Sequence, residues 1–278
     1  MRIVRFDIAG RVGFGVENAD GGVVDTGFTD LREIIESDVT DPDVRRRLLG
    51  GPLVHPDRLL APVADRCQII YAGGNYRDHL AEVSHLIAPA EPVFFPGLWS
   101  SVIGPGEPIV IPDAASKTDY EVELAIVIGR TARRVAAADA WSHIFGFTIV
   151  NDVSARDVMQ REQLQIMLCK SPDTFCPIGP RIVTADEVGD LGGRRVTTHV
   201  NGDLRQDAGT DDMVVGVADL LEFLTRTVTL FPGDIVTTGT PGGVGAFRNP
   251  PEFLRPGDTV TVAVEGIGEL TNPLVAGW

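Results

Sequence analysis

The chain has 278 residues, with 44% hydrophobic and 23% charged side chains, which is the ordinary composition of a globular protein with a sizeable core. Because domains usually span roughly 100–200 residues, the length predicts one large domain and a small additional one. The net charge of −15 argues against nucleic acid as a partner, since phosphates would be repelled, and against docking on an anionic membrane.

Residues 1–63 are predicted to form a small N-terminal α/β domain and a linker. Residues 1–28 alternate apolar and polar side chains, which is typical of two or three short strands. Asp30 is placed to cap a following helix that carries Glu33 in its first turn. The helical pattern then ends at a Gly-Gly-Pro sequence at residues 50–52, and residues 56–62 are predicted to be the linker.

Residues 64–278 are predicted to form a strand-rich domain with scattered helices. The segment 67–72 is apolar like a buried strand, and a Pro-Gly-Asp turn precedes each of the strands expected at 235–237 and 259–264. Strands and helices do not alternate regularly, which favours an α+β fold over a doubly wound sheet. Helices are predicted at 76–87, 138–144, 156–168 and 217–227.

The cysteines and the apolar runs indicate a cytoplasmic protein. Cys67, Cys169 and Cys176 are odd in number and lack C-x-x-C spacing, which favours free thiols in a reducing compartment. Apolar runs such as 124–128 are far shorter than the roughly 18 residues that cross a bilayer. We therefore expect a soluble chain that makes no membrane contact.

The segment 119–129 carries the strongest chemical signal of the chain. Its sequence alternates like a strand, so Glu121 and Glu123 are expected on one face, beside an apolar interior. Two like charges in that position repel each other and are poorly solvated, and a hard divalent cation would stabilise both. The alternative is an edge strand with a solvated acidic face.

A third acid follows a second apolar strand, expected at 145–150. Asp152 stands where this strand gives way to a helix that begins near Ala155. With Glu121 and Glu123 it would complete an all-carboxylate set that leaves open positions for substrate and water. The alternative role of Asp152 is that of N-cap for the helix.

Five segments, in this order and spacing, resemble the fumarylacetoacetate hydrolase family, and the resemblance covers residues 67–275. Each segment alone is a weak signal, but the five in order are a specific one. They are Asn75-Tyr76-Arg77-Asp78-His79 and the stretches 119–129, 151–158, 170–180 and 233–245.

The resemblance implies a mixed, rolled β-sheet core with few helices, a small N-terminal domain and a homodimer. It implies that Glu121, Glu123 and Asp152 are the metal ligands. Mg²⁺ is the metal expected, with Mn²⁺ or Ca²⁺ as alternatives. It further implies that Lys170 contacts a small 2-oxo acid substrate.

The resemblance also assigns a catalytic dyad and a substrate loop. The dyad falls on His79 and Glu82, which share a helix face at i and i+3, so that the carboxylate can hold one tautomer of the ring. The loop Thr238-Gly239-Thr240 is implied to line the pocket and hold the substrate carboxylate. The glycines around it are expected to let the backbone approach a ligand closely.

Departures from the family pattern concern the substrate contacts and leave the metal ligands intact. Residues 96–99 read Pro-Gly-Leu-Trp where the family often has Lys-Pro, so a cationic contact is missing. Met159 stands where a Gln is usual after Arg-Asp-Val, and Gln160 follows it as the candidate substrate contact. Arg156 and Asp157 are expected to pair with each other at the start of their helix.

Together these residues predict a metal-dependent hydrolase that cleaves a C–C bond in a small 2-oxo acid such as an acylpyruvate. The metal would polarise the ketone, His79 held by Glu82 would activate water, and Lys170 would stabilise the enolate that leaves. The same groups can decarboxylate, hydrate, dehydrate or isomerise, so a lyase or isomerase is the closest alternative. A non-catalytic metal-binding or ligand-binding relative is the second alternative.

Overall fold

The structure is a computed structural model that describes the chain except for residues 19, 83–90, 160–163 and 278. Most of its strands form one twelve-stranded sheet. Along the sheet the hydrogen-bonded order is β4 (Leu53–Val54), β3 (Val23–Asp25), β2 (Arg11–Glu17), β1 (Arg2–Ile8), β14 (Cys176–Thr184), β12 (Ile144–Asn151), β11 (Val122–Ile128), β17 (Ile235–Thr237), β6 (Ile69–Gly73) and β7 (Val93–Gly97), with β5 (Arg58–Leu60) beside β1 and β8 (Val102–Ile103) beside β14.

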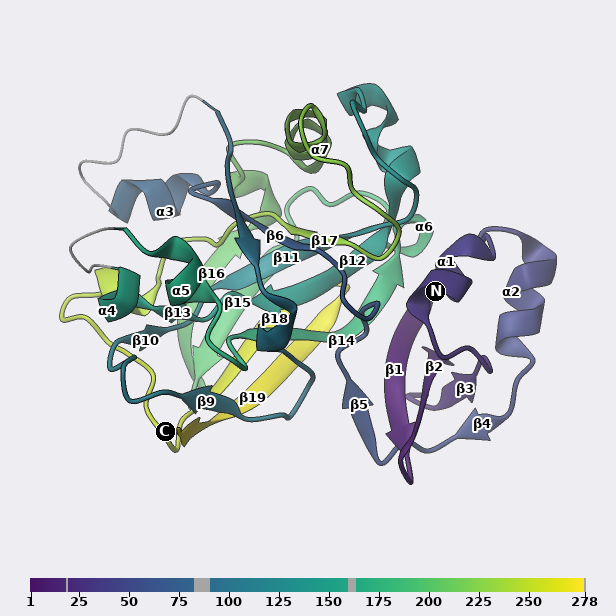
Figure 1. Ribbon diagram of the computed structural model, residues 1–278, viewed down its shortest axis with the longest axis horizontal. Coiled ribbons are helices and arrows are strands. Elements are labelled where there is room, and N and C mark those ends of the chain that lie inside the picture. The colour runs from purple at the N-terminus through teal and green to yellow at the C-terminus, as the bar shows by residue number, and fades with distance from the viewer. Residues whose placement is uncertain (19, 83–90, 160–163, 278) are drawn as a thin grey trace.

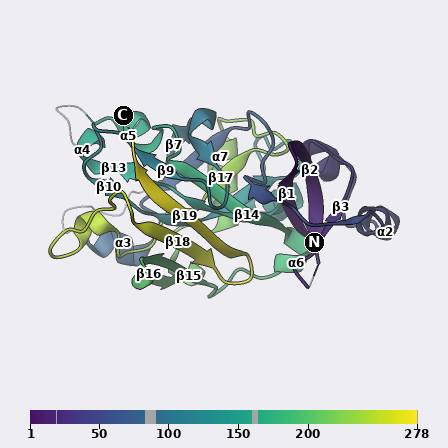
Figure 2. The same cartoon turned by 90° about the horizontal axis from the view of Figure 1, so that it is seen from below.

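The remaining strands form a five-stranded sheet and a two-stranded ribbon. The sheet has the order β16 (Asp203–Gly209), β15 (Arg195–Val200), β18 (Thr259–Val264), β19 (Gly268–Ala276) and β9 (Ile109–Ile111). The ribbon pairs β10 (Thr118–Asp119) with β13 (Ser154–Ala155). Figure 2 shows β15, β16, β18 and β19 together along one side of the molecule.

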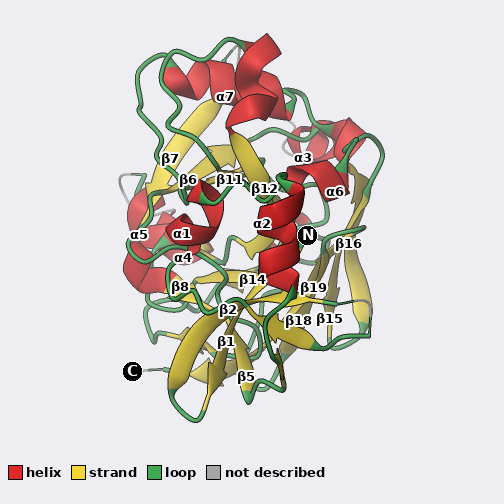
Figure 3. Ribbon diagram, turned by 90° about the vertical axis from the view of Figure 1, so that its right-hand side faces the viewer, coloured by secondary structure: helices red, strands yellow, loops and turns green. Residues whose placement is uncertain are grey.

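The helices are short and lie mostly at the ends of the molecule. Figures 1 and 2 show α3, α4 and α5 gathered at one end and α2 with the N-terminal strands at the other, and Figure 3 views the latter end. None of the described helices is long and apolar enough to cross a membrane. They are α1 (Leu31–Glu36), α2 (Pro42–Leu49), α3 (Arg77–Glu82), α4 (Arg156–Met159), α5 (Ile166–Lys170), α6 (Ala185–Val188), α7 (Val217–Thr225) and the 3-10 helices η1 (Trp99–Ser101), η2 (Ala137–His143), η3 (Thr210–Asp212) and η4 (Gly245–Phe247).

The N-terminal segment follows the sequence prediction in its strands and its first helix. Asp30 caps α1 by accepting from Arg32 N at 2.9 Å, and Glu33 reaches back to Asp30 N at 3.3 Å, a reciprocal capping box. The predicted linker contains the strand β5, which pairs with β1, and β4, which precedes the linker, pairs with β3. Since β1 also pairs with β14, these strands extend the large sheet, and a domain boundary at residue 63 stays a prediction.

The predicted helices had mixed outcomes. The helix at 217–227 is confirmed as α7, and the helix at 76–87 is present as α3, with the rest of that range outside the described residues. The segment at 138–144 is a 3-10 helix instead, because it buries only Ala140 and so gains little packing from an α-helical turn. The helix at 156–168 was wrong: α4 and α5 are separate, since Gln165 has φ −116° and ψ 65° and cannot continue a helix.

Strand β11 lies in the middle of the large sheet and divides two apolar cores. Its even-numbered residues, such as Leu124 and Ile126, pack into a core shared with the five-stranded sheet. Ala125 and Val127 face the other core, which includes residues of α1 and β6. Because side chains alternate along a strand, Glu123 lies on this second face, in a fully buried part of the molecule.

Candidate metal centre

Two antiparallel strands bring the three predicted carboxylates together. Glu123 lies on β11, Glu121 immediately precedes this strand, and Asp152 follows β12, whose Val150 is the register partner of Glu123. Asp152 N donates to the carbonyl oxygen of Glu121 at 2.9 Å, which fixes the two chain segments beside each other. One carboxylate oxygen of each acid lies within 4.8 Å of the others, and all three acids are buried.

The two alternatives for these acids were wrong. A solvated edge strand is excluded because Glu121 and Glu123 are only 5% and 1% exposed and β11 has a neighbouring strand on each side. Asp152 does not cap the following helix, because β13 separates it from Arg156, where α4 begins.

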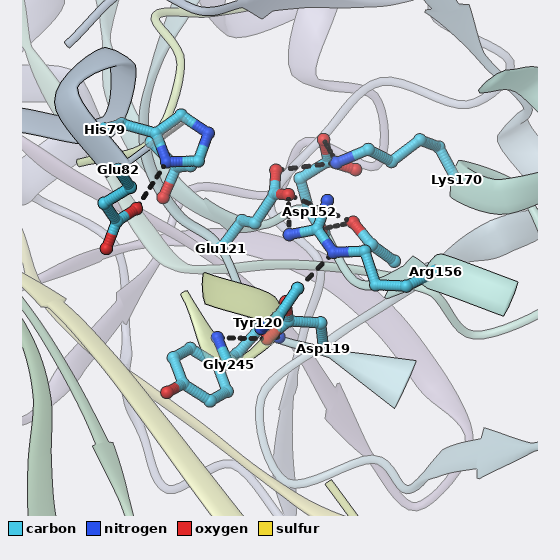
Figure 4. A network of polar contacts seen from close by, with 12 residues as sticks. His79, Glu82, Asp119, Tyr120, Glu121, Asp152, Arg156, Lys170 and Gly245 are labelled. Atoms are coloured by element: carbon cyan, nitrogen blue, oxygen red, sulfur yellow. Dashed lines mark hydrogen bonds and ion pairs between the residues drawn. The ribbon is translucent and has the colours of Figure 1, made fainter. Parts of the chain in front are cut away.

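Lys170 lies beside the cluster and pairs with two of its three acids. Its Nζ donates to Oε2 of Glu121 and to Oδ2 of Asp152, both at 2.6 Å, and lies 5.7 Å from the centre of the Phe95 ring. The side chain is 4% exposed, so the ammonium has left water and depends on these two carboxylates. The predicted catalytic lysine and two predicted metal ligands therefore form one buried network, shown in Figure 4.

The carboxylates differ in the direction of their pKa shifts. Burial raises the pKa of Glu121, but the nearby Lys170 and Arg156 outweigh it and lower the value to about 2. Burial and the two neighbouring carboxylates raise the pKa of Glu123 well above its usual range. Burial also raises the pKa of Asp152, against the opposing effect of Lys170. The network thus lacks positive charge on the side of Glu123.

The donor set fits a divalent cation. Oδ1 of Asp152 is buried without a hydrogen-bond partner, and a buried carboxylate oxygen left in this way is costly. An oxygen-only ligand set is the one that Mg²⁺, Mn²⁺ and Ca²⁺ prefer. A cation beside Glu121, Glu123 and Asp152 would supply the missing charge and a partner for this oxygen.

The predicted dyad forms and lies beside the cluster. Nδ1 of His79 lies 3.0 Å from Oε2 of Glu82, and both side chains are largely buried. Figure 4 shows the imidazole on one side of Glu121 and Lys170 on the other. The ring also packs against Phe247, with centroids 5.8 Å apart. Because Glu82 holds Nδ1, Nε2 is the ring nitrogen left for a ligand.

The predicted substrate loop is buried and largely engaged with the protein. Thr238 Oγ1 donates to the carbonyl oxygen of Leu124 at 3.0 Å, and Gly239 N donates to Glu123 Oε2 at 3.2 Å. Thr240 Oγ1 accepts from Gln206 Nε2 at 2.9 Å and keeps its own hydrogen available. A contact of this loop with a substrate carboxylate stays a prediction, and Gln160 lies outside the described residues.

The sequence reasoning missed two charged residues of the network. Arg156 was expected to pair with Asp157, but it does not. The side chain is buried, with 8% exposure. Its Nε donates to Asp119 Oδ2 at 2.9 Å and its Nη2 donates to Glu121 Oε1 at 2.6 Å. Asp157 instead accepts from Ser116 Oγ at 2.7 Å. The position of Asp119, two residues before Glu121 on the same alternating stretch, was the sequence feature that could have placed Asp119 near the cluster.

Comparison with known proteins gives matches over the whole chain. Residues 68–275 match the family described as fumarylacetoacetate (FAA) hydrolase C-terminal. The chain is 39% identical over 289 aligned positions to the mitochondrial oxaloacetate tautomerase FAHD2A of Homo sapiens, covering 99% of this chain and 92% of the human protein.

Two solved structures illustrate the range of activities among its relatives. A fumarylacetoacetate hydrolase from the psychrophile Exiguobacterium antarcticum is 40% identical with a TM-score of 0.88, and each chain is covered completely. A 5-carboxymethyl-2-hydroxymuconate delta-isomerase from Mycobacterium smegmatis is 37% identical with a TM-score of 0.81, again over both complete chains. Hydrolysis and isomerisation thus both occur on this fold.

Proposed function

Because the chain belongs to the fumarylacetoacetate hydrolase family, we propose that it is a divalent-metal-dependent enzyme that interconverts the keto and enol forms of a small 2-oxo acid. That it is an enzyme for a small keto acid follows from the family itself. The finer choice of keto–enol chemistry is supported by the resemblance to the human oxaloacetate tautomerase, which extends over 99% of the chain. Oxaloacetate is accordingly the first substrate to test.

The observation that carries the proposal is the position of the His79–Glu82 dyad beside the buried carboxylates. A proton leaving C3 of the keto acid would go to Nε2 of His79, the electrons of the C–H bond would form the C2–C3 double bond, and the 2-oxo oxygen would take up negative charge. The imidazolium would then return its proton to that oxygen, which completes the enol. Glu82 stabilises the imidazolium through Nδ1 at 3.0 Å.

Glu121, Glu123 and Asp152 would hold the metal, which would supply Lewis acidity to the 2-oxo group. Lys170 has three N–H bonds, of which two are used by Glu121 and Asp152, so the third can reach the substrate oxygen that gains charge. Its position also gives an anionic substrate a local positive group in a chain whose net charge is −15.

Hydrolysis of the C–C bond of an acylpyruvate is the second candidate. It is favoured by the same dyad, because Nε2 of His79 can take a proton from water as well as from carbon, and by the resemblance to a bacterial fumarylacetoacetate hydrolase. In this reaction hydroxide adds to the distal carbonyl, the C–C bond breaks, and the pyruvate enolate leaves with the bonding electrons and is protonated at carbon.

Proton NMR in D₂O separates the two reactions. A tautomerase exchanges the C3 hydrogens of oxaloacetate for deuterium faster than the buffer does and leaves the carbon skeleton intact. A hydrolase consumes an acylpyruvate and releases pyruvate and a second carboxylic acid. Each assay is run on EDTA-treated protein with and without Mg²⁺ or Mn²⁺. Metal-independent exchange, or no turnover of either substrate, would contradict the proposal.

A further inference from the structure

Residues 239–246, here called the glycine loop, donate main-chain N–H groups to carboxylates on three other elements, α3, β10 and β11. Four acidic side chains are held in this way. The bonds are Gly239 N to Glu123 Oε2 at 3.2 Å, Gly242 N to Asp78 Oδ1 at 2.9 Å, Gly243 N to Glu82 Oε1 at 2.6 Å, Gly245 N to Asp119 Oδ1 at 2.7 Å and Ala246 N to Asp119 Oδ2 at 2.9 Å.

Glycine is needed at two positions of this loop because oxygen atoms of other segments lie where a side chain would begin. A Cβ atom at Gly245 would lie 1.9 Å from the carbonyl oxygen of Glu252 and 2.7 Å from Oδ1 of Asp119. Gly243 has a φ of +98°, and a Cβ there would lie 2.3 Å from the carbonyl oxygen of Arg205. At these two positions the glycines allow a close approach to the protein's own oxygens, which fixes the loop in place, and the expected approach to a ligand stays a prediction.

Asp119 connects the glycine loop to a predicted metal ligand. Its carboxylate is 0% exposed and accepts from Gly245 and Ala246 on one side and from Arg156 Nε on the other. The same guanidinium donates to Oε1 of Glu121 at 2.6 Å. Figure 4 shows this line from Gly245 through Asp119 and Arg156 to Glu121. The orientation of Glu121 thus depends on a group that the loop holds.

The other end of the loop sets the orientation of the dyad. Gly243 N donates to one carboxylate oxygen of Glu82, and the second oxygen of Glu82 faces Nδ1 of His79. A shift of the loop would therefore move the carboxylate that selects the His79 tautomer.

We propose that Asp119 is a positioning residue that makes the glycine loop a link between the His79–Glu82 dyad and the metal ligand Glu121. This inference rests on the proposed function, because it assigns a role toward the metal. It follows that loss of the Asp119 charge weakens metal binding through Arg156 and slows turnover through Glu82, although Asp119 touches neither metal nor substrate.

The test is Asp119→Asn, with Mn²⁺ affinity read from the electron paramagnetic resonance signal of free Mn²⁺, which needs no substrate. The amide keeps the size of the side chain but turns its N–H bonds toward two of the four donors from which Asp119 accepts, which are the backbone amides of Tyr120, Gly245 and Ala246 and the Arg156 guanidinium. Outer partners of metal ligands typically contribute 10–100-fold to affinity, and we expect a loss in that range. Turnover should stay reduced when Mn²⁺ saturates the variant, because the dyad has lost its anchor.

Asp234→Asn is the matched control. Asp234 is a 4% exposed carboxylate that also accepts backbone amides, from Gln68 and Phe231, but it lies at the opposite end of β17 from the glycine loop. Its replacement should affect thermal stability and leave Mn²⁺ affinity unchanged. If Asp119→Asn does not fold, Arg156→Lys replaces it, since a lysine cannot bridge Asp119 and Glu121 as the guanidinium does.

The outcomes separate this inference from the proposed function. Unchanged Mn²⁺ affinity in a folded Asp119→Asn or Arg156→Lys protein overturns the inference alone. Full turnover of Asp119→Asn at saturating Mn²⁺ overturns the link to the dyad. If the unsubstituted chain binds no Mn²⁺, the proposed function fails first and the inference falls with it.

Discussion

A Cβ atom at Gly97 on β7 would lie 2.5 Å from Cε2 of Tyr71 on β6, so the Tyr71 ring leaves no room for a side chain at residue 97. The Tyr71 ring stacks on Phe95 with centroids 5.4 Å apart, and Phe95 lies beneath Nζ of Lys170 at 5.7 Å. The departure from the family sequence at residue 97 is therefore connected to the packing that supports the buried lysine.

Gly97→Ala should destabilise the protein. A methyl group forced against a fully buried ring costs typically about 1–3 kcal/mol, which should appear as a lower unfolding temperature. In a Tyr71→Ala background the same substitution should cost much less, because the clashing ring is gone and only the contact with Ile69 Cγ2 at 3.2 Å remains. Gly192→Ala is the control, since a Cβ there has only ordinary contacts, the nearest at 3.5 Å. A Gly97→Ala protein as stable as this control would contradict the argument.

His79→Ala should lose turnover and keep its metal. Loss of a general acid–base group typically lowers kcat by about 10²–10⁴-fold. Mn²⁺ affinity should be unchanged, because the predicted metal ligands are the three carboxylates and do not include the imidazole. His143→Ala is the control, since this partly exposed histidine precedes β12 outside the network. Wild-type exchange of the C3 hydrogens by His79→Ala would rule out its role as the base.

The parts of the fold that the sequence predicted are those that depend on local chemistry. Asp30 was identified as a helix cap because side-chain to backbone bonds are formed within a few residues. Glu121 and Glu123 were placed on one face because strand alternation is also local. Their convergence with Asp152 was expected from the positions of the three acids at the ends of two apolar strands. The family resemblance was needed to assign roles to His79 and Lys170.

The parts that were missed depend on contacts between distant segments. The pairing of β1 with β14 joins residues about 180 positions apart, and no local pattern indicates it. Arg156 was assigned to its neighbour Asp157, whereas its partner Asp119 lies 37 residues earlier. The homodimer, which the family resemblance implies, and the cytoplasmic location, which the cysteines and apolar runs indicate, stay predictions.

Glu123→Gln should stabilise the metal-free protein and abolish its stabilisation by metal. Burial and the charges of Asp152 and Glu121 raise the pKa of Glu123 well above its usual range, so its ionised form destabilises the metal-free fold. We expect the glutamine variant to unfold at a higher temperature than the wild type in EDTA at neutral pH. Added Mn²⁺ should raise the unfolding temperature of the wild type and not that of the variant.

The same shift predicts a pH dependence with a defined sign. The pKa of Glu123 is higher in the folded state than in the unfolded state. At pH values between these two pKa values, the folded state binds one more proton than the unfolded state. The stability of the metal-free protein should therefore increase as the pH falls through this range. Glu123→Gln should lack this component, whereas Glu269→Gln, at an exposed acid on β19, should behave like the wild type. Equal pH profiles for all three proteins would contradict the assignment.

Lys170→Met should make the stability of the protein depend on the metal. The Lys170 ammonium is buried, and although burial alone lowers its pKa, Asp152 and Glu121 outweigh this and raise it, so the charge persists. Removing one member of a buried ion pair typically costs about 3–5 kcal/mol, because the remaining charges are left uncompensated. The variant should therefore unfold at a clearly lower temperature in EDTA.

Mn²⁺ should then stabilise Lys170→Met by more than it stabilises the wild type, because the cation replaces part of the charge that Glu121 and Asp152 have lost. Turnover should not return, since no ammonium is left to contact the substrate. The chain's other lysine, Lys117, is exposed, so Lys117→Met is the matched control and should change neither quantity. A Mn²⁺ shift in Lys170→Met no larger than that of the wild type would show that the lysine and the cation do not balance the same carboxylates.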